Sequence, residues 1–202
     1  MNSVEPYLAP YVQATQKHNG GFRSLLWASH VSQRARFHAI VRLGEFRNRR
    51  ILDGGCGHAD FLDYLIQYEI RYEHYTGIEA VEELAEVARG KNRPRSAIIR
   101  ADFLREPQRM LVGADVVVLC GSLNTFDVEA FHRTIRLAYD AAGESLIFNF
   151  LSSGRLAAAA WLHWHRPEDV LAFARNFTDD VASLSDYMDG DCTIAMRKGG
   201  SP

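Results

Sequence analysis

A glycine-rich turn between an apolar run and a predicted helix is the feature that most constrains how this chain can fold. The apolar run ends at Asp53, the turn contains Gly54, Gly55 and Gly57, and helical periodicity starts at 59. Glycine lets a ligand approach the bare backbone, and the helix N-terminus presents free N–H groups. A strand, a tight loop and a helix in this order predict a site for a nucleotide-like cofactor.

The rest of the chain alternates strand-like and helix-like segments. Strands are expected over 50–54, 75–79, 96–100, 115–120, 145–150, 181–187 and 193–197. Helices are expected over 25–43, 59–68, 81–89, 128–142 and 167–176. Alternation implies right-handed βαβ units, and a short link at 189–191 makes the last two strands a hairpin. The predicted fold class is α/β: a doubly wound, Rossmann-like seven-stranded sheet, mostly parallel with an antiparallel C-terminal strand.

The length of 202 residues predicts one domain over 1–202, large enough for a full hydrophobic core. Within it, 1–48 are expected to form an N-terminal arm and a capping helix, and 49–198 the Rossmann-like core. The first 21 residues are polar and are expected to be irregular or to form a short helix.

Net charge and cysteine content indicate which binding partners and which cellular compartment to expect. The net charge of −2 predicts no general attraction to nucleic acid or to an anionic membrane. Basic clusters at 47–50 and 91–95 are interpreted as solvated loop ends. An odd set of three cysteines, Cys56, Cys120 and Cys192, fits a reducing compartment. No signal pattern or membrane-spanning run is present in the sequence, so a cytoplasmic location is expected.

Three acids end or follow the first three predicted strands, and parallel strands bring such positions to one crevice. Glu79 has the spacing from the loop expected of a carboxylate that accepts hydrogen bonds from ribose hydroxyls. Asp102 can accept from an exocyclic amine such as that of adenine, and Phe103 can lie against a purine face. Together with Asp53, these residues predict one cofactor site.

The pattern resembles the class I S-adenosylmethionine-dependent methyltransferases. Residues 53–59 resemble the Asp-x-Gly-x-Gly-x-Gly loop of that family, 77–79 its second-strand acid and 101–103 its adenine-side acid. Ala59 stands where the family has its third glycine, and alanine is small enough for close helix–strand packing there. The resemblance runs over about 27–198 and includes the seven-strand layout.

This resemblance implies that the chain binds S-adenosylmethionine and releases S-adenosylhomocysteine. It assigns the glycine loop and Asp53 to the methionine part, Glu79 to the ribose, and Asp102 with Phe103 to adenine. The candidate cofactor-binding residues are Asp53, Gly54, Gly55, Gly57, Glu79, Ala80, Asp102, Phe103, Cys120 and Arg36. No catalytic residue and no metal ligand is assigned.

Other segments resemble a subgroup of small bacterial methyltransferases whose substrates are generally unassigned. They are Trp27, 33–37, 120–124, 148–151 and 186–187. Within them, Arg36 is expected to bind the methionine carboxylate as a charge-assisted pair, or else to be a surface arginine beside Arg34.

Two rival interpretations remain. The first is an NAD(P)-dependent oxidoreductase, whose nicotinamide dinucleotide is bound by a G-x-G-x-x-G loop. In this chain the last position of that motif is Asp60, and a carboxylate there would repel the pyrophosphate. The second rival is a cofactor-binding regulatory domain without turnover.

The methyl acceptor is expected beyond the fourth predicted strand, near 120–124. Motifs of DNA-methylating enzymes and of metal-dependent catechol-type enzymes are missing there. The sequence therefore predicts metal-independent, in-line methyl transfer to a small molecule or another non-DNA acceptor, with no membrane partner. The oligomeric state is left open.

Several residues near the acceptor region have two interpretations. Cys120 is expected to line the cofactor pocket rather than to act as a nucleophile. Asn124 either orients an acceptor or caps the following helix, and Asp127 is expected to be the N-cap. His163 and His165 belong either to a lid with a histidine base or to an amphipathic helix over 156–164 at the sheet edge.

Overall fold

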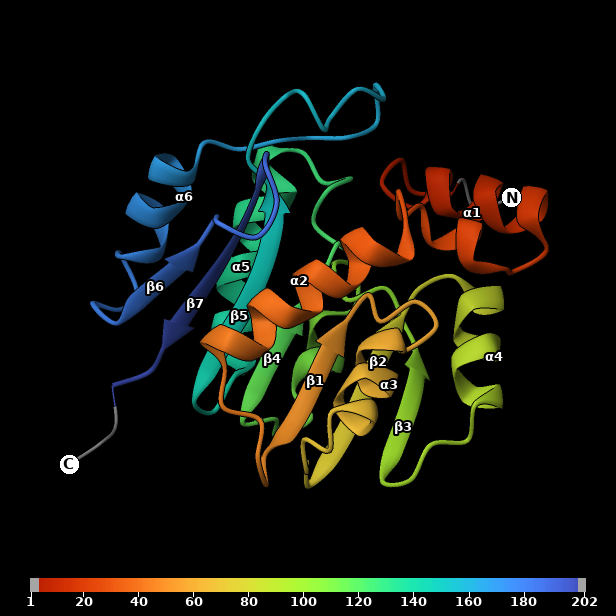
Figure 1. Ribbon diagram of the computed structural model, residues 1–202, viewed down its shortest axis with the longest axis horizontal. Coiled ribbons are helices and arrows are strands. Elements are labelled where there is room, and N and C mark those ends of the chain that lie inside the picture. The colour runs from red at the N-terminus through yellow and green to blue at the C-terminus, as the bar shows by residue number, and fades with distance from the viewer. Residues whose placement is uncertain (1–3, 200–202) are drawn as a thin grey trace.

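A seven-stranded sheet forms the centre of the computed structural model, which describes residues 4–199 (Figure 1). The strands are β1 (Arg50–Gly54), β2 (His74–Glu79), β3 (Ser96–Arg100), β4 (Val116–Leu119), β5 (Ser145–Leu151), β6 (Val181–Leu184) and β7 (Asp191–Arg197). Their order across the sheet is β3-β2-β1-β4-β5-β7-β6. All neighbours are parallel except β7, which runs antiparallel to both β5 and β6. This topology confirms the predicted fold class.

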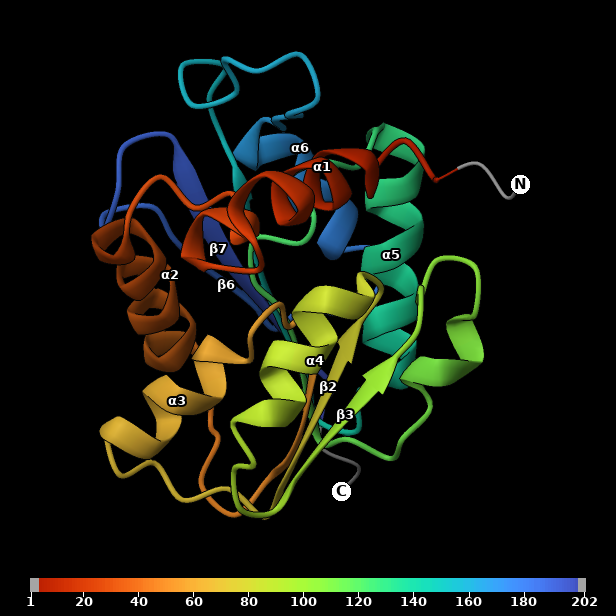
Figure 2. The same cartoon turned by 90° about the vertical axis from the view of Figure 1, so that its right-hand side faces the viewer.

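Helices cover both faces of the sheet. They are α1 (Ala9–His18), α2 (His30–Leu43), α3 (Asp60–Gln67), α4 (Glu82–Gly90), α5 (Val128–Ala141) and α6 (Pro167–Ala174), with 3-10 turns η1 (Phe22–Leu25) and η2 (Pro107–Met110). Helices α2, α3 and α4 pack on one face, and α5 and α6 on the other (Figures 1 and 2). None of the helices within 4–199 is long and apolar enough to cross a membrane.

Strand β4 shows how the core fills both sides of the sheet. Val116 and Val118 pack with the side chains of α2 and α3, whereas Val117 and Leu119 pack with those of α5. Successive side chains of a strand point to opposite faces, so a strand covered on both faces is apolar throughout. The continuous apolar run at 115–120 is therefore explained by burial on both faces.

The arm and one long connection meet at the same end of the sheet. Helix α1 lies across the end to which the arrows of β1 to β4 point, and the irregular segment 152–166 lies at that end as well (Figures 1 and 2). Residues 1–3 of the expected arm lie outside the described residues. Ligands of open parallel sheets bind at this end.

The structure corrects two predicted helices. The helix expected over 25–43 starts only at His30, because Leu26 is left-handed and the Ser29 and Ser32 side chains form a capping box there. The helix expected over 156–164 is absent. Its backbone makes long-range bonds instead: the N–H of His163 donates to the Asn124 carbonyl (2.8 Å) and that of His165 to the Leu151 carbonyl (2.9 Å).

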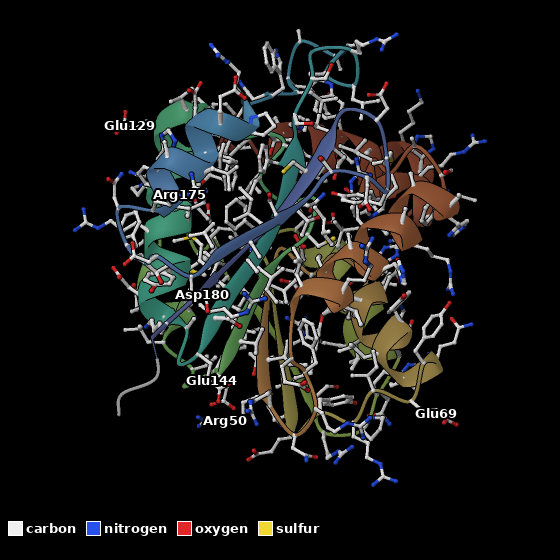
Figure 3. All side chains as sticks on the ribbon, turned by 60° about the vertical axis from the view of Figure 1, so that its left-hand side comes forward. Arg50, Glu69, Glu129, Glu144, Arg175 and Asp180 are labelled. Carbon is white, nitrogen blue, oxygen red and sulfur yellow. The ribbon has the colours of Figure 1, made fainter. Side chains whose placement is uncertain are left out.

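The opposite end of the sheet carries paired charges. Arg49 bonds Glu144 (2.6 Å) and Arg50 bonds Asp115 (2.6 Å), where β1 and β5 begin. Figure 3 shows Arg50 and Glu144 projecting outward at this end. The basic cluster at 47–50 therefore includes solvated, acid-paired loop ends, as expected.

Candidate functional site

A cavity opens at the carboxyl ends of β1 to β4. Eight of the ten predicted cofactor-binding residues line it: Asp53, Gly55, Gly57, Glu79, Ala80, Asp102, Phe103 and Cys120. The fold thus brings most of the predicted site together from four strand ends.

The glycine loop is held in place by β2. The N–H groups of Gly55 and Cys56 both donate to the Ile78 carbonyl, at 2.8 and 3.0 Å. Gly55 has φ +75°, and a Cβ on it would lie 2.5 Å from the Cβ of Ser122. Only glycine allows the loop to approach the segment after β4 this closely, so the turn shapes the cavity.

Glu79 links the loop to the start of α4. Its carboxylate accepts from the N–H of Gly57 and from the N–H of Val81, both at 2.9 Å. Burial raises the pKa of Glu79, although these two bonds favour the charged form. Each carboxylate oxygen can accept a further bond, so Glu79 can hold the loop and also a ligand hydroxyl.

Asp53 lies buried at the end of β1. The Tyr75 hydroxyl donates to it at 2.5 Å. Burial raises the pKa of Asp53 to about 7; the bond from Tyr75 opposes this shift and the nearby charge of Glu79 adds to it. The negative charge of this carboxyl therefore changes near neutral pH.

Asp102 is bound by the N-terminal arm, a contact that the sequence analysis missed. The Tyr7 hydroxyl donates to Asp102 Oδ2 (2.6 Å), and the N–H of Leu104 donates to Oδ1 (3.0 Å). The Tyr7 ring packs edge-on against Phe126, with 5.2 Å between centroids. Tyr11, one helical turn further, also lines the cavity. The i, i+4 spacing of two tyrosines in a polar arm was the available signal.

Asp60 also lines the cavity, at the start of α3. It accepts from Gln33 Nε2 (2.8 Å) and from Lys91 Nζ (2.7 Å). Burial opposes its ionisation, but these two partners lower its pKa overall. A negative charge thus lies where a dinucleotide-binding loop would contact the pyrophosphate of its cofactor.

The structure corrects the prediction for Arg36. Arg36 does not line the cavity but forms a buried ion pair with Asp191, with Nη2–Oδ2 at 2.5 Å and Nε–Oδ2 at 2.8 Å. Its guanidinium lies 5.0 Å from the centroid of the Trp27 ring. The partner is 155 residues away along the chain, so no local pattern revealed it. Gly54 likewise does not line the cavity, because it packs inside β1 against Leu119.

Asp191 is the centre of a wider buried network. It also accepts from Asn149 Nδ2 (3.1 Å) and from the Tyr187 hydroxyl. The other end of the Asn149 amide, Oδ1, accepts from the N–H of Gly121 at 2.8 Å. The network therefore connects α2 and β7 to the segment after β4 that lines the cavity.

That segment resolves several open interpretations. Cys120 is buried, and burial raises its pKa well above the usual thiol value, so it lines the cavity as a neutral thiol. Asp127 is the N-cap of α5 and accepts from the N–H of Ala130 at 2.8 Å, as predicted. Asn124 lines the cavity and does not cap the helix.

Segment 156–165 forms part of the cavity wall without forming a helix. Trp161 and Leu162 line the cavity, whereas His163 and His165 do not. The His165 ring stacks on Phe131 with 3.8 Å between centroids, and burial lowers its pKa to about 4. Among residues 4–199, no three histidine, cysteine, aspartate or glutamate side chains are grouped so that they could hold a metal ion.

Of the comparisons with known proteins, the one with solved structures identifies the architecture. No family model and no curated protein matches the sequence. The chain superposes on magnesium protoporphyrin IX methyltransferase (ChlM) from Synechocystis PCC 6803, solved with bound SAH, with a TM-score of 0.71 and 14% identity over 96% of this chain and 100% of that one. The chain has the fold of S-adenosylmethionine-dependent methyltransferases. This methyltransferase fold includes β7 between β5 and β6.

Two further solved structures show the same fold. The pyocyanin biosynthetic protein PhzM matches with a TM-score of 0.70 and 20% identity, over 96% of this chain and 62% of PhzM. An O-methyltransferase family protein from Burkholderia thailandensis matches with a TM-score of 0.66 and 16% identity, over 100% of this chain and 75% of that one.

Proposed function

We propose that this chain transfers a methyl group from S-adenosylmethionine to a small-molecule acceptor. The observation that carries the proposal is the set of three carboxylates, the buried Asp53 and Glu79 and the half-buried Asp102, around the glycine loop in a methyltransferase fold. The cavity suits this cofactor, which has cationic sulfonium and ammonium groups and donor hydroxyl and amine groups. Buried acceptors that retain free lone pairs complement those groups.

The proposed roles follow the order of the strand ends. Glu79 would accept from the ribose hydroxyls, Asp102 from the adenine amine, and Phe103 would pack against adenine. Asp53 and the backbone of the glycine loop would hold the methionine part. The bond between Tyr7 and Asp102 would be shared or replaced when adenine binds, because Asp102 Oδ2 already accepts from Tyr7.

The cofactor supplies a methyl group that is electrophilic because it is bonded to a sulfonium. The chain aligns the acceptor with it and excludes water, which lowers the barrier without a Lewis acid. Tyr11, Leu25 and Trp27 line the cavity from the N-terminal segment. We therefore propose that 1–48 cap the core formed by 49–198 within one domain, and that transfer is metal-independent.

The proposal extends to partner class and location. A net charge of −2 and acid-paired arginine and lysine side chains favour a small acceptor over DNA. Three free, buried cysteines favour a reducing compartment, so the proposed location is the cytoplasm.

Isothermal titration calorimetry tests the cofactor assignment. We expect micromolar binding of S-adenosylhomocysteine and no response to NADH. Glu79→Gln should weaken that binding by about 1–3 kcal/mol if the carboxylate contacts the ribose. The matched control is Glu82→Gln, three residues further on a half-exposed face, which should leave the affinity unchanged.

A second variant is needed because Glu79 also holds the glycine loop, so Glu79→Gln could lose binding through misfolding alone. Asp102→Asn changes a side chain that accepts from the N–H of Leu104 and from the Tyr7 hydroxyl but does not hold the glycine loop, and it should weaken binding as well. A folded wild-type protein that binds NADH, or neither ligand, would overturn the proposal.

A further inference from the structure

Part of the cavity wall is not needed for the proposed cofactor contacts, and it is aromatic. A Cβ on Gly121 would lie 2.5 Å from Cη2 of Trp27, so this ring covers the segment after β4. Tyr11 lies on the same segment, with its hydroxyl 3.5 Å from the Gly121 carbonyl. The bond from His163 to Asn124 brings the neighbouring Trp161 to this wall.

The same wall contains polar side-chain atoms that the protein does not satisfy. Ser122 Oγ, Asn124 Oδ1 and Thr125 Oγ1 are buried and have no hydrogen-bond partner. All three residues line the cavity, and Thr125 is only 5% exposed. Buried polar atoms without partners cost free energy and are rare in folded proteins. Three of them within four residues indicate a ligand that bonds them.

The charges around the cavity restrict that ligand further. Among residues 4–199, no lysine, arginine or histidine lines the cavity, whereas Asp53, Asp60, Glu79 and Asp102 do. Unlike the methionine carboxylate of the cofactor, which is accompanied by its own ammonium group, an anionic acceptor would be buried there without a counter-charge and beside like charges, which is unfavourable.

We propose, on the basis of the methyl transfer proposed above, that the acceptor is a small, uncharged aromatic amine held between these rings and the oxygens of Asn124 and Thr125. The amine N–H would donate to Asn124 Oδ1, an atom that can only accept. The aromatic ring would pack against Trp27 and Trp161, because flat apolar groups favour such walls.

The protonation state of Tyr11 on this wall also fits an amine acceptor. The buried Tyr11 hydroxyl stays protonated, since burial and the charge of Glu79 raise its pKa. A neutral amine needs no prior deprotonation. Its nitrogen lone pair forms the C–N bond, and the donor's carbon–sulfur bond breaks with its electron pair left on sulfur. The methylated nitrogen loses its proton to water once the product has left the cavity.

A matched ligand series on the protein saturated with S-adenosylhomocysteine tests the assignment. The probes are 5-aminoindane, 5-hydroxyindane, 5-methylindane and indane-5-carboxylate, which share one ring system. We expect 5-aminoindane to bind at least about tenfold more tightly than the carboxylate, and more tightly than the phenol and the methyl compound. Tighter binding of the carboxylate or phenol, or no binding of any ring, would overturn the assignment.

A pair of isosteric variants locates the site. Thr125→Val should weaken 5-aminoindane binding by about three- to tenfold and leave 5-methylindane binding unchanged. Thr134→Val is the control, because Thr134 Oγ1 is also buried without a partner but lies in α5 away from the cavity. Equal effects of the two variants would contradict the proposed contact.

The two proposals fail in different ways. Loss of the proposed function appears as no binding of S-adenosylhomocysteine to the folded wild-type protein. A wrong acceptor class appears as normal binding of S-adenosylhomocysteine with the wrong order of indane affinities.

Discussion

Replacing Asp191 by asparagine should destabilise the protein strongly without affecting the cofactor site. Asp191 has a side chain that is 0% exposed, and its partner Arg36 is 7% exposed. Asparagine keeps the shape but removes the charge, so the guanidinium of Arg36 is left buried without a counter-ion. Breaking a buried pair in this way costs about 3–5 kcal/mol.

The structure supplies a matched control in the same connection. Asp189 pairs with Arg155, but the two side chains are 90% and 83% exposed. Such a pair is weakened by water and by side-chain entropy. Asp189→Asn should therefore leave the free energy of unfolding nearly unchanged.

Urea unfolding followed by far-UV circular dichroism measures both variants, and calorimetry measures their affinity for S-adenosylhomocysteine. We expect Asp191→Asn to lower the urea midpoint well below that of Asp189→Asn while the folded protein keeps its affinity. Arg36→Met should behave like Asp191→Asn, because Arg36 does not line the cavity.

Two results would refute this reasoning. Equal midpoints for Asp191→Asn and Asp189→Asn would mean that the buried pair is not formed. A folded Arg36→Met protein that loses more than about tenfold in affinity would restore the sequence-based prediction that Arg36 binds the methionine carboxylate.

Three further predictions concern titration and backbone strain. Burial raises the pKa of Asp53 from 3.8 to about 7, so the folded state holds its proton more tightly, and this carboxyl lowers stability as pH rises through that range. Asp53→Asn should remove that decline in urea midpoints, and an unchanged profile would contradict it. His165 has the opposite effect on the pH dependence of stability. Burial lowers its pKa from 6.5 to about 4, so the folded state loses stability as the pH is lowered through that range. His165→Phe should flatten the acid side of the same profile. Ala59 has φ 55°, so Ala59→Gly should stabilise the folded protein by about 1 kcal/mol. Gly57→Ala should destabilise it, because Gly57 has φ 54° and an added Cβ would lie 2.6 Å from Leu25. Calorimetric unfolding measures the sign of both changes.

Local pattern was sufficient to predict the strands that carry the site. The strands expected over 50–54 and 96–100 have those bounds in β1 and β3, because apolar residues and their polar or glycine-rich boundaries are close in sequence. Parallel pairing then places Asp53, Glu79 and Asp102 at the carboxyl ends of neighbouring strands, and eight of the predicted residues line the cavity there.

Contacts across long stretches of chain could not be predicted in this way. Tyr7 reaches Asp102 over 95 residues, and Arg36 reaches Asp191 over 155. The segment 156–164 has helical spacing, but the backbone N–H groups of His163 and His165 donate to the carbonyls of Asn124 and Leu151. These acceptors are far away in the sequence, so local spacing did not indicate them. Tertiary hydrogen bonds overrode local propensity at this site.

The buried network explains how a cationic residue can lie behind the cavity wall without giving the cavity a positive charge. The guanidinium of Arg36 is 5.0 Å from Trp27, a lining residue, so an unpaired charge there would attract anionic ligands through the ring. Asp191 neutralises it, and Asn149 joins the same carboxylate to the N–H of Gly121 on the wall. The network therefore leaves no unpaired positive charge behind the wall, which is the condition that an uncharged acceptor requires.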